Sequence, residues 1–296
     1  METARCKAFV AAATDGSFTL AAERLGYTHS GISQLVAAFE DELGFPLLRR
    51  SNRGVSLTRE GRALLPVIRT LLQQEERLFQ EVANLQGLDR GQISIASYSS
   101  AATHWLPRVI SAFEKKYPGI SIELRDGTRG EVLDWMEGGV ADVAFMAATP
   151  DLPYEWRPLE DIPLLAVLPP EHPRAGDESF PLTACRGEPF VASAFGRDED
   201  TLRTLKQAGV EPDIRFRTME DNTALGLIAN GLGISIMNGL VLKNCNFNVV
   251  LRPLDPPQHL TFCAAVRSWD DASPAVRKFC AYALHILTDE KYADQL

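Results

Sequence analysis

Hydroxyl and amide side chains recur at helical spacing early in the chain. Ser30 and Gln34 share one face of a predicted helix, with Ser33 beside them. Such side chains can hydrogen-bond the edges of nucleic-acid bases, and their short length would let the helix backbone approach a groove closely. Thr28 is placed to cap this helix and to hold a phosphate, and His29 lies at the edge of the same face. The pattern therefore predicts a helix whose polar face reads base edges.

Arginine is concentrated just after this helix. From Leu47 to Gln74 there are six arginines and one acid, Glu60. Arg50 and Arg53 lie in or beside a turn-rich segment between two short predicted strands. A local excess of guanidinium groups is what contacts with a phosphate backbone require. We therefore expect Arg50 and Arg53 to bind DNA phosphates.

A further group of polar residues follows predicted strands in the later part of the chain. Ser99 and Ser100 follow one strand, and Thr128 and Arg129 follow the next. In open α/β sheets, ligands bind at the carboxyl ends of strands, near helix N-termini. Further along the chain, Phe195 follows one more predicted strand, and Met219 and Asn222 follow another. Hydroxyls beside helix N-termini favour a small anion such as a carboxylate, which Arg129 could pair with. Alternatively, each hydroxyl only caps a helix and Arg129 is only solvated.

No constellation of catalytic residues was found. The five histidines show no metal-ligand spacing, and neither a G-x-S-x-G motif nor a phosphate-binding loop occurs. The five cysteines are an odd number without a C-x-x-C pair, which indicates buried thiols in a reducing cytoplasm. We therefore predict a protein that is not an enzyme and needs neither a metal nor a cofactor.

The elements that position the early polar residues form a helix-turn-helix. The first helix of the pair spans 18–25, with Ser17 as its predicted N-cap and Gly26 as its stop. The second helix runs from 28 to 43. Its apolar stripe consists of Ile32, Leu35, Val36, Phe39 and Leu43. A preceding helix over 2–14 and two following strands, at 45–50 and 55–58, complete a predicted winged helix.

A long helix is predicted from Arg59 to about Gly87. Its apolar residues alternate by three and four, which indicates a heptad seam that pairs with a second helix. The residues predicted to dimerise the chain are Ile68, Leu71, Leu78, Val82 and Leu85. The alternative is that the helix lies on its own domain. Pro66 should kink the helix or mark a tight first stretch.

Beyond residue 91 the pattern changes to alternating strands and helices, which predicts parallel α/β units. One lobe takes 91–168 and 260–296, and a second lobe takes 169–259. Strand 164–168 should close the first lobe, and the segments after it and at 255–258 should cross between the lobes. A single helix is expected over 103–116. Two α/β lobes with a cleft between them are the architecture of periplasmic binding proteins.

Residues 5–65 resemble the LysR-type transcriptional regulators. The similarity rests on the spacing of a GSFT-x-AAE-x-L start, an ELG end and an R-x-x-R-G-V-x-LT-x-x-G wing. Three differences from the family pattern are His29, Ser30 and Gly31, where Gln, Pro and Ala are usual, and no Lys or Arg lies between His29 and Phe39. We therefore expect the family's fold and role, with a base preference of its own.

The resemblance implies a domain order and a set of partners. A DNA-binding domain would span 1–58, a linker helix and hinge 59–90, and an effector-binding domain 91–296. The partners would be double-stranded DNA with inverted half-sites, a small-molecule effector and further copies of the chain in a dimer or tetramer. The resemblance leaves RNA polymerase open as another partner.

The charge distribution separates this prediction from its alternative, a solute-binding protein with N-terminal assembly helices. The net charge is −9, but residues 1–90 hold 11 basic and 11 acidic side chains, so the acidic excess lies in the later part. No secretory signal pattern and no apolar run of membrane-spanning length were found. Together with the arginine-rich wing, these features favour a cytoplasmic DNA-binding regulator.

Overall fold

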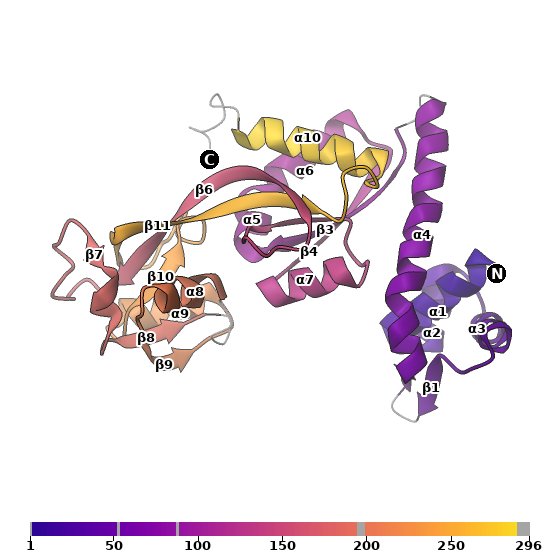
Figure 1. Cartoon of the computed structure of the whole chain (residues 1–296), viewed down its shortest axis with the longest axis horizontal. Helices are drawn as coiled ribbons and strands as arrows, with labels where there is room; N and C mark the ends of the chain where they lie inside the picture. The colour runs from indigo at the N-terminus through magenta and orange to yellow at the C-terminus, as the bar shows by residue number, and fades with distance from the viewer. Residues whose placement is uncertain (1, 52–53, 87–88, 194–198, 289–296) are drawn as a thin grey trace. The chain divides into compact units, whose positions relative to one another are not determined.

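The computed structural model describes residues 2–51, 54–86, 89–193 and 199–288. The chain divides into two compact units (Figure 1). One comprises Met1–Gly91 with Glu137–Val140, and the other comprises Gln92–Met136 with Ala141–Leu296. Two of the predicted site residues, Arg53 and Phe195, lie outside the described residues.

Three helices form the body of the N-terminal unit: α1 (Thr3–Asp15), α2 (Phe18–Leu25) and α3 (His29–Leu43). Their limits follow from local chemistry. The Ser17 hydroxyl accepts a hydrogen bond from the Leu20 N–H, and Gly26 ends α2 in the left-handed region with φ of 71°. The core between the helices includes Phe9, Ala21, Ile32, Val36 and Phe39. The predicted helix-turn-helix is confirmed.

A two-stranded wing follows α3. Strand β1 (Leu48–Ser51) pairs antiparallel with β2 (Gly54–Leu57), so the predicted start of the first strand at residue 45 was too early. The reason lies in Glu40 of α3, whose carboxylate accepts hydrogen bonds from the N–H groups of Leu47 and Leu48 at 2.6 and 2.9 Å. These bonds hold Leu47, which precedes β1, and Leu48, which begins it, against the end of α3.

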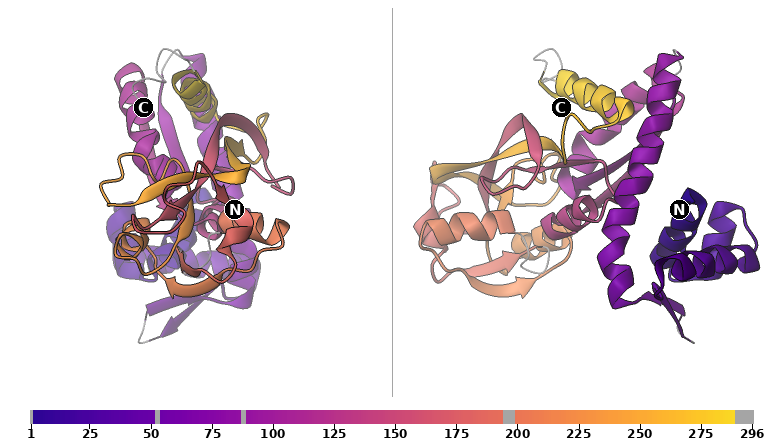
Figure 2. Two further views of the ribbon diagram at one scale, coloured as in Figure 1. Left: turned by 90° about the vertical axis from the view of Figure 1, so that its left-hand side faces the viewer. Right: turned by 45° about the vertical axis from the view of Figure 1, so that its right-hand side comes forward.

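Helix α4 (Arg59–Leu85) runs continuously through Pro66. Figure 2 shows α4 extending past the three-helix body. Its first half packs on that body, where Ile68 is buried in the core with Leu64, Leu65 and Leu72 against it. Ile68 therefore stabilises its own domain, and its predicted place in a dimer seam was wrong. Among the described side chains of α4, the exposed large apolar residues are Val67, Leu71, Leu78, Phe79, Val82 and Leu85, most of them in the second half of the helix.

The C-terminal unit contains two lobes. Lobe I is built from β3 (Gly91–Tyr98), α5 (Ser99–His104), α6 (Leu106–Lys116), β4 (Ile120–Gly127), α7 (Arg129–Glu137), β5 (Val143–Ala147) and α10 (Pro274–Thr288). Lobe II is built from β7 (Phe180–Pro181), β8 (Pro189–Ala192), α8 (Glu199–Gln207), β9 (Asp213–Arg217), α9 (Asp221–Ala229) and β10 (Ser235–Asn238). A short 3-10 helix, η1, spans Leu182–Cys185.

Two long antiparallel strands, β6 (Glu155–Leu168) and β11 (Val250–Val266), pass through both lobes (Figure 1). The sheet order is β10-β6-β11-β5-β3-β4, with β7 paired to β11. Residues 164–167 pair with β10 of lobe II, so the crossing lies within β6 and not after residue 168, as the sequence had suggested. Residues 255–258 lie within β11, at a register shift, where this strand passes from lobe II to lobe I. The predicted second crossing is therefore part of a continuous strand.

The predicted helix over 103–116 is two helices, α5 and α6, which meet at Trp105. Pro107 is placed in the first turn of α6, where the missing N–H of proline costs nothing. Helix α5 starts at Ser99, directly after β3, so the loop that was expected to present Ser99 and Ser100 is the first turn of a helix.

Candidate nucleic-acid interface and effector site

The polar face of α3 is presented to solvent. Thr28, His29, Ser30 and Gln34 are all exposed. The Thr28 hydroxyl accepts a hydrogen bond from the Gly31 N–H at 3.1 Å, which caps the helix as expected, and lies 3.1 Å from the Ser30 hydroxyl. The structure thus brings these four predicted residues together on one surface.

Arg50 of β1 lies against this surface. Its guanidinium donates a hydrogen bond to the Ser33 hydroxyl at 2.8 Å and lies 4.3 Å from the centre of the Phe18 ring. The His29 ring meets the other edge of this cluster, 6.1 Å from Phe18. Because α3 has no Lys or Arg over residues 29–39, Arg50 supplies a positive charge that the helix itself lacks. Sequence reasoning placed Arg50 on the wing and Ser33 on the helix but did not predict their contact.

A cavity of about 420 Å³ lies between lobes I and II. Five of the predicted effector residues line it: Ser99, Ser100, Thr128, Arg129 and Met219. Asn222 is exposed on α9 and is not among the described lining residues, because its side chain follows Asp221 onto a different face of the helix. The apolar part of the lining consists of Leu164, Met219, Met237, Val241 and Leu260.

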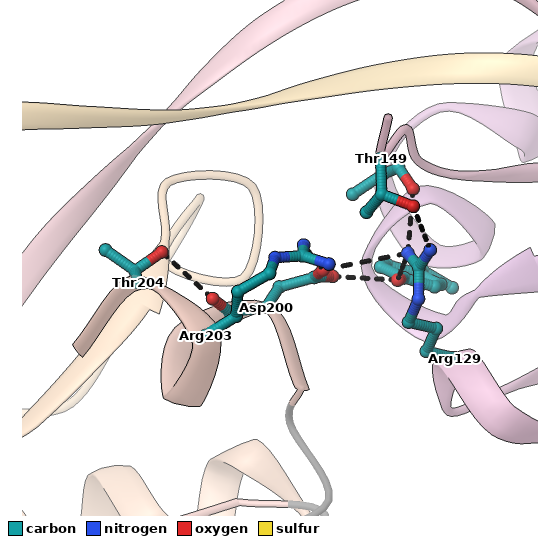
Figure 3. A network of polar contacts seen from close by, with 7 residues as sticks. Arg129, Thr149, Asp200, Arg203 and Thr204 are labelled. Carbon is teal, nitrogen blue, oxygen red and sulfur yellow. Dashed lines mark hydrogen bonds and ion pairs between the residues drawn. The ribbon is translucent and has the colours of Figure 1, made fainter. Parts of the chain in front are cut away.

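Arg129 is buried at the centre of a polar network (Figure 3). Its guanidinium donates to the Thr149 hydroxyl at 2.8 Å, to the Ala147 carbonyl at 2.9 Å and to the Tyr98 hydroxyl at 3.2 Å. It also forms an ion pair with Asp200, at 3.7 Å. Since Arg129 belongs to lobe I and Asp200 to lobe II, this pair joins the two lobes across the cavity.

Asp200 was not predicted as a site residue. It is buried, accepts a hydrogen bond from the Tyr98 hydroxyl at 2.8 Å and pairs with Arg203 one turn along α8. Burial and the nearby Asp200 carboxylate raise the pKa of Tyr98 well above its usual value, so Tyr98 stays a neutral donor. In the sequence, Asp200 reads as an acid in the first turn of a helix, where such residues commonly complement the helix dipole.

Two of the hydroxyls that were expected to receive an anion, those of Ser99 and Thr128, have partners within the chain. Ser99 donates to Asp126 at 2.9 Å. The Thr128 hydroxyl and backbone N–H donate to Glu131 at 2.7 and 2.9 Å, so this pair caps the start of α7. Helix capping, the alternative that the sequence left open, thus accounts for Thr128.

All five cysteines are free thiols. Cys6, Cys185, Cys263 and Cys280 are buried, and Cys245 is partly buried. Burial raises the pKa values of the Cys185, Cys263 and Cys280 thiols to about 12, which leaves them protonated and unreactive. Among the described residues, no group of His, Cys, Asp and Glu could hold a metal ion, and no helix has the length and hydropathy needed to cross a membrane.

Two family models match the chain. The model for the bacterial regulatory helix-turn-helix protein of the lysR family covers residues 4–62, and the model for the LysR substrate binding domain covers residues 86–287. The second match alone spans more than half of the chain.

Known proteins extend the similarity to full length. An uncharacterized HTH-type transcriptional regulator of Bacillus subtilis, YvbU, is 31% identical over 293 residues, covering 98% of this chain and 100% of that protein. A full-length OxyR variant from Pseudomonas aeruginosa has a TM-score of 0.76 at 20% identity, covering 97% of this chain and 96% of that one. The CcmR regulatory domain from Synechocystis PCC6803, solved with 2-PG, has a TM-score of 0.61 at 21% identity, covering 67% and 98%. The chain belongs to the LysR family of DNA-binding transcriptional regulators, with a helix-turn-helix and an effector-binding domain.

Proposed function

We propose that α3 and the wing bind inverted half-sites in double-stranded DNA, and that a small molecule in the cavity between the lobes changes this binding. The observation that carries the first part is the exposed polar face of α3 with Arg50 held against it. Ser30, Gln34 and His29 would contact bases, and Thr28, Arg50 and Arg53 would contact phosphates. Ser33, which the sequence suggested as a base contact, would instead position Arg50. The protein would act in the cytoplasm and would not be an enzyme.

The second part is supported by the cavity and by the relative that was solved with a ligand. The CcmR regulatory domain, which matches the effector-binding domain of this chain, was solved in complex with 2-PG. A ligand can shift a conformational equilibrium only by its differential affinity for the two states. A molecule that contacts both lobes meets this condition, because all its contacts form together only at one degree of lobe closure.

Operator selection followed by measurement of specificity tests the first part. The full chain is used to enrich binding sites from random double-stranded DNA, and affinity is then measured for the enriched site and for a scrambled one. Gln34→Ala should lower the ratio of the two affinities by roughly fivefold or more, because an amide that contacts a base edge discriminates by about 1–3 kcal/mol.

The matched control is Gln207→Ala, which removes an exposed amide from α8 of lobe II. It should leave both affinities unchanged. If Gln34→Ala weakens the enriched and scrambled sites equally, base reading by Gln34 is wrong. If the full chain enriches no sequence at all, the assignment of α3 as the reading helix is wrong.

A further inference from the structure

Several hydrogen-bond donors that line the cavity between the lobes already contact carboxylates of the protein. Arg129 is paired with Asp200, and Ser99 donates to Asp126. Thr128 donates to Glu131 at the start of α7. A ligand carboxylate would therefore meet donors that already contact carboxylates of the protein.

The described lining of the cavity also has more acidic than basic side chains. Its described part contains one guanidinium, that of Arg129, and five carboxylates: Asp126, Glu131, Asp200, Glu220 and Asp221. Arg129 and Arg203 together offset Asp200. Asp126 accepts a hydrogen bond from the Ser99 hydroxyl, and the Ser193 hydroxyl bonds Asp221; neither hydroxyl carries a charge. The described lining consequently carries a negative formal charge.

We propose that the effector of this protein carries a positively charged amine, held between Asp126 of lobe I and Asp221 of lobe II. This inference rests on the proposed function, since it concerns the ligand of the same cavity. A primary ammonium has three donors and forms short, charge-assisted hydrogen bonds with carboxylates. A short aliphatic part would lie on Met219, Met237 and Leu260, and about 420 Å³ lies within the usual range for small ligands.

The environment of Asp221 agrees with this assignment. Burial raises the pKa of Asp221 and the neighbouring Glu220 adds to the rise, whereas the bond with Ser193 lowers it. A cation bound beside this carboxylate would offset part of the cost of its burial. Because Asp126 and Asp221 come from different lobes, one ammonium group, or the two ends of a diamine, would bridge the cleft.

Calorimetry on the full chain at constant ionic strength tests the proposal. The probes are butylamine and 1,4-diaminobutane, compared with butyrate, succinate and 1-butanol, which share their size but not their charge. We expect the amines to bind with one site per chain and the carboxylates not to bind. Asp126→Asn and Asp221→Asn should each weaken amine binding by roughly tenfold or more, since a hydrogen bond to a charged group contributes about that much to an equilibrium constant.

Glu114→Gln is the matched control, because it removes an exposed carboxylate from α6 and should not change amine binding. Asp126 is also exposed, so Asp126→Asn provides a variant whose folding should be unaffected if Asp221→Asn proves unstable.

Equal amine binding by both cavity variants and the wild type would indicate a general attraction to an acidic surface, and it would overturn the proposal. Binding of the carboxylates alone, or of neither class, would also overturn it. DNA binding, measured separately by operator selection, would still decide the first part of the proposed function.

Discussion

Arg50 connects two parts of the DNA-binding surface that the sequence presents separately. It belongs to β1, yet its guanidinium bonds Ser33 in the middle of α3 and covers the Phe18 ring of α2. A cation over an aromatic face at an exposed site contributes about 0.5–1 kcal/mol, and the hydrogen bond adds direction. The arginine is therefore held toward the recognition surface before DNA arrives, which lowers the entropic cost of the phosphate contact.

This arrangement predicts a non-additive pair of substitutions. Arg50→Ala should weaken binding to enriched and scrambled DNA alike and reduce the salt slope by about 1, because one phosphate contact is lost. Ser33→Ala should weaken binding less, since it removes only the bond that positions Arg50. The double variant should be no weaker than Arg50→Ala alone, because the two residues act as one unit.

Fluorescence anisotropy over a series of salt concentrations measures all four proteins. Ser30→Ala gives the comparison, since the Ser30 hydroxyl contacts Thr28 and not Arg50. Loss of a proposed base contact at Ser30 should weaken binding to the enriched site and leave binding to scrambled DNA and the salt slope unchanged. If the losses from Ser33→Ala and Arg50→Ala simply add, and Ser33→Ala acts only on the enriched site, then Ser33 contacts a base, as the sequence suggested, and does not position Arg50.

At the scale of elements, the start of α4 is built against the turn that follows α3. The Thr58 hydroxyl caps α4 by accepting from the Gly61 N–H at 2.8 Å and donates to the Pro46 carbonyl at 2.9 Å. A Cβ on Gly61 would lie 2.1 Å from the Leu47 carbonyl oxygen. Glycine is needed here because of close backbone approach, although α4 is helical at this position.

Gly61→Ala should therefore destabilise the chain despite the better helix propensity of alanine. Overpacking of this kind costs roughly 1–3 kcal/mol, which exceeds the gain of about 1 kcal/mol from propensity. Gly130→Ala in α7 is the control, since nothing lies within 4 Å of a Cβ there and a neutral or stabilising effect is expected. Urea denaturation followed by circular dichroism gives both free energies of unfolding. A more stable Gly61→Ala protein would contradict the contact.

The elements that the sequence predicted well are those whose limits depend on local features. Helices α2 and α3 were placed closely because their caps at Ser17 and Thr28 and the stop at Gly26 are local features. The pairing of residues 164–167 with β10 was not predicted, because a buried apolar strand fits either lobe and nothing local names its partner. Asp200 was missed for a similar reason: its contact with Tyr98 joins residues 102 positions apart. Only the folded chain brings such groups together.

At the scale of the whole molecule, the second half of α4 leaves an apolar surface exposed. Leu78 and Phe79 are 61% and 60% exposed, and Leu85 is 87% exposed. Their spacing fits a heptad seam, whereas Ile68 is buried in the core of the DNA-binding domain and Leu64 packs against that core. We propose that Leu71, Leu78, Val82 and Leu85 pair with the same helix of a second copy.

Leu78→Asp tests this seam, because it would place a carboxylate in an apolar contact where no partner is provided. Sedimentation velocity should show a smaller assembly than the wild type. Leu20→Asp is the control, since Leu20 is 53% exposed but lies on α2, away from the seam, and the assembly of this variant should be unchanged.

Two-fold pairing also predicts operator half-sites whose centres are about 34–36 Å apart, or a multiple of this. Leu78→Asp should then bind a single half-site with the same affinity as the wild type but lose the advantage of the paired site. If Leu78→Asp sediments at the wild-type mass and keeps that advantage, α4 does not hold the assembly together.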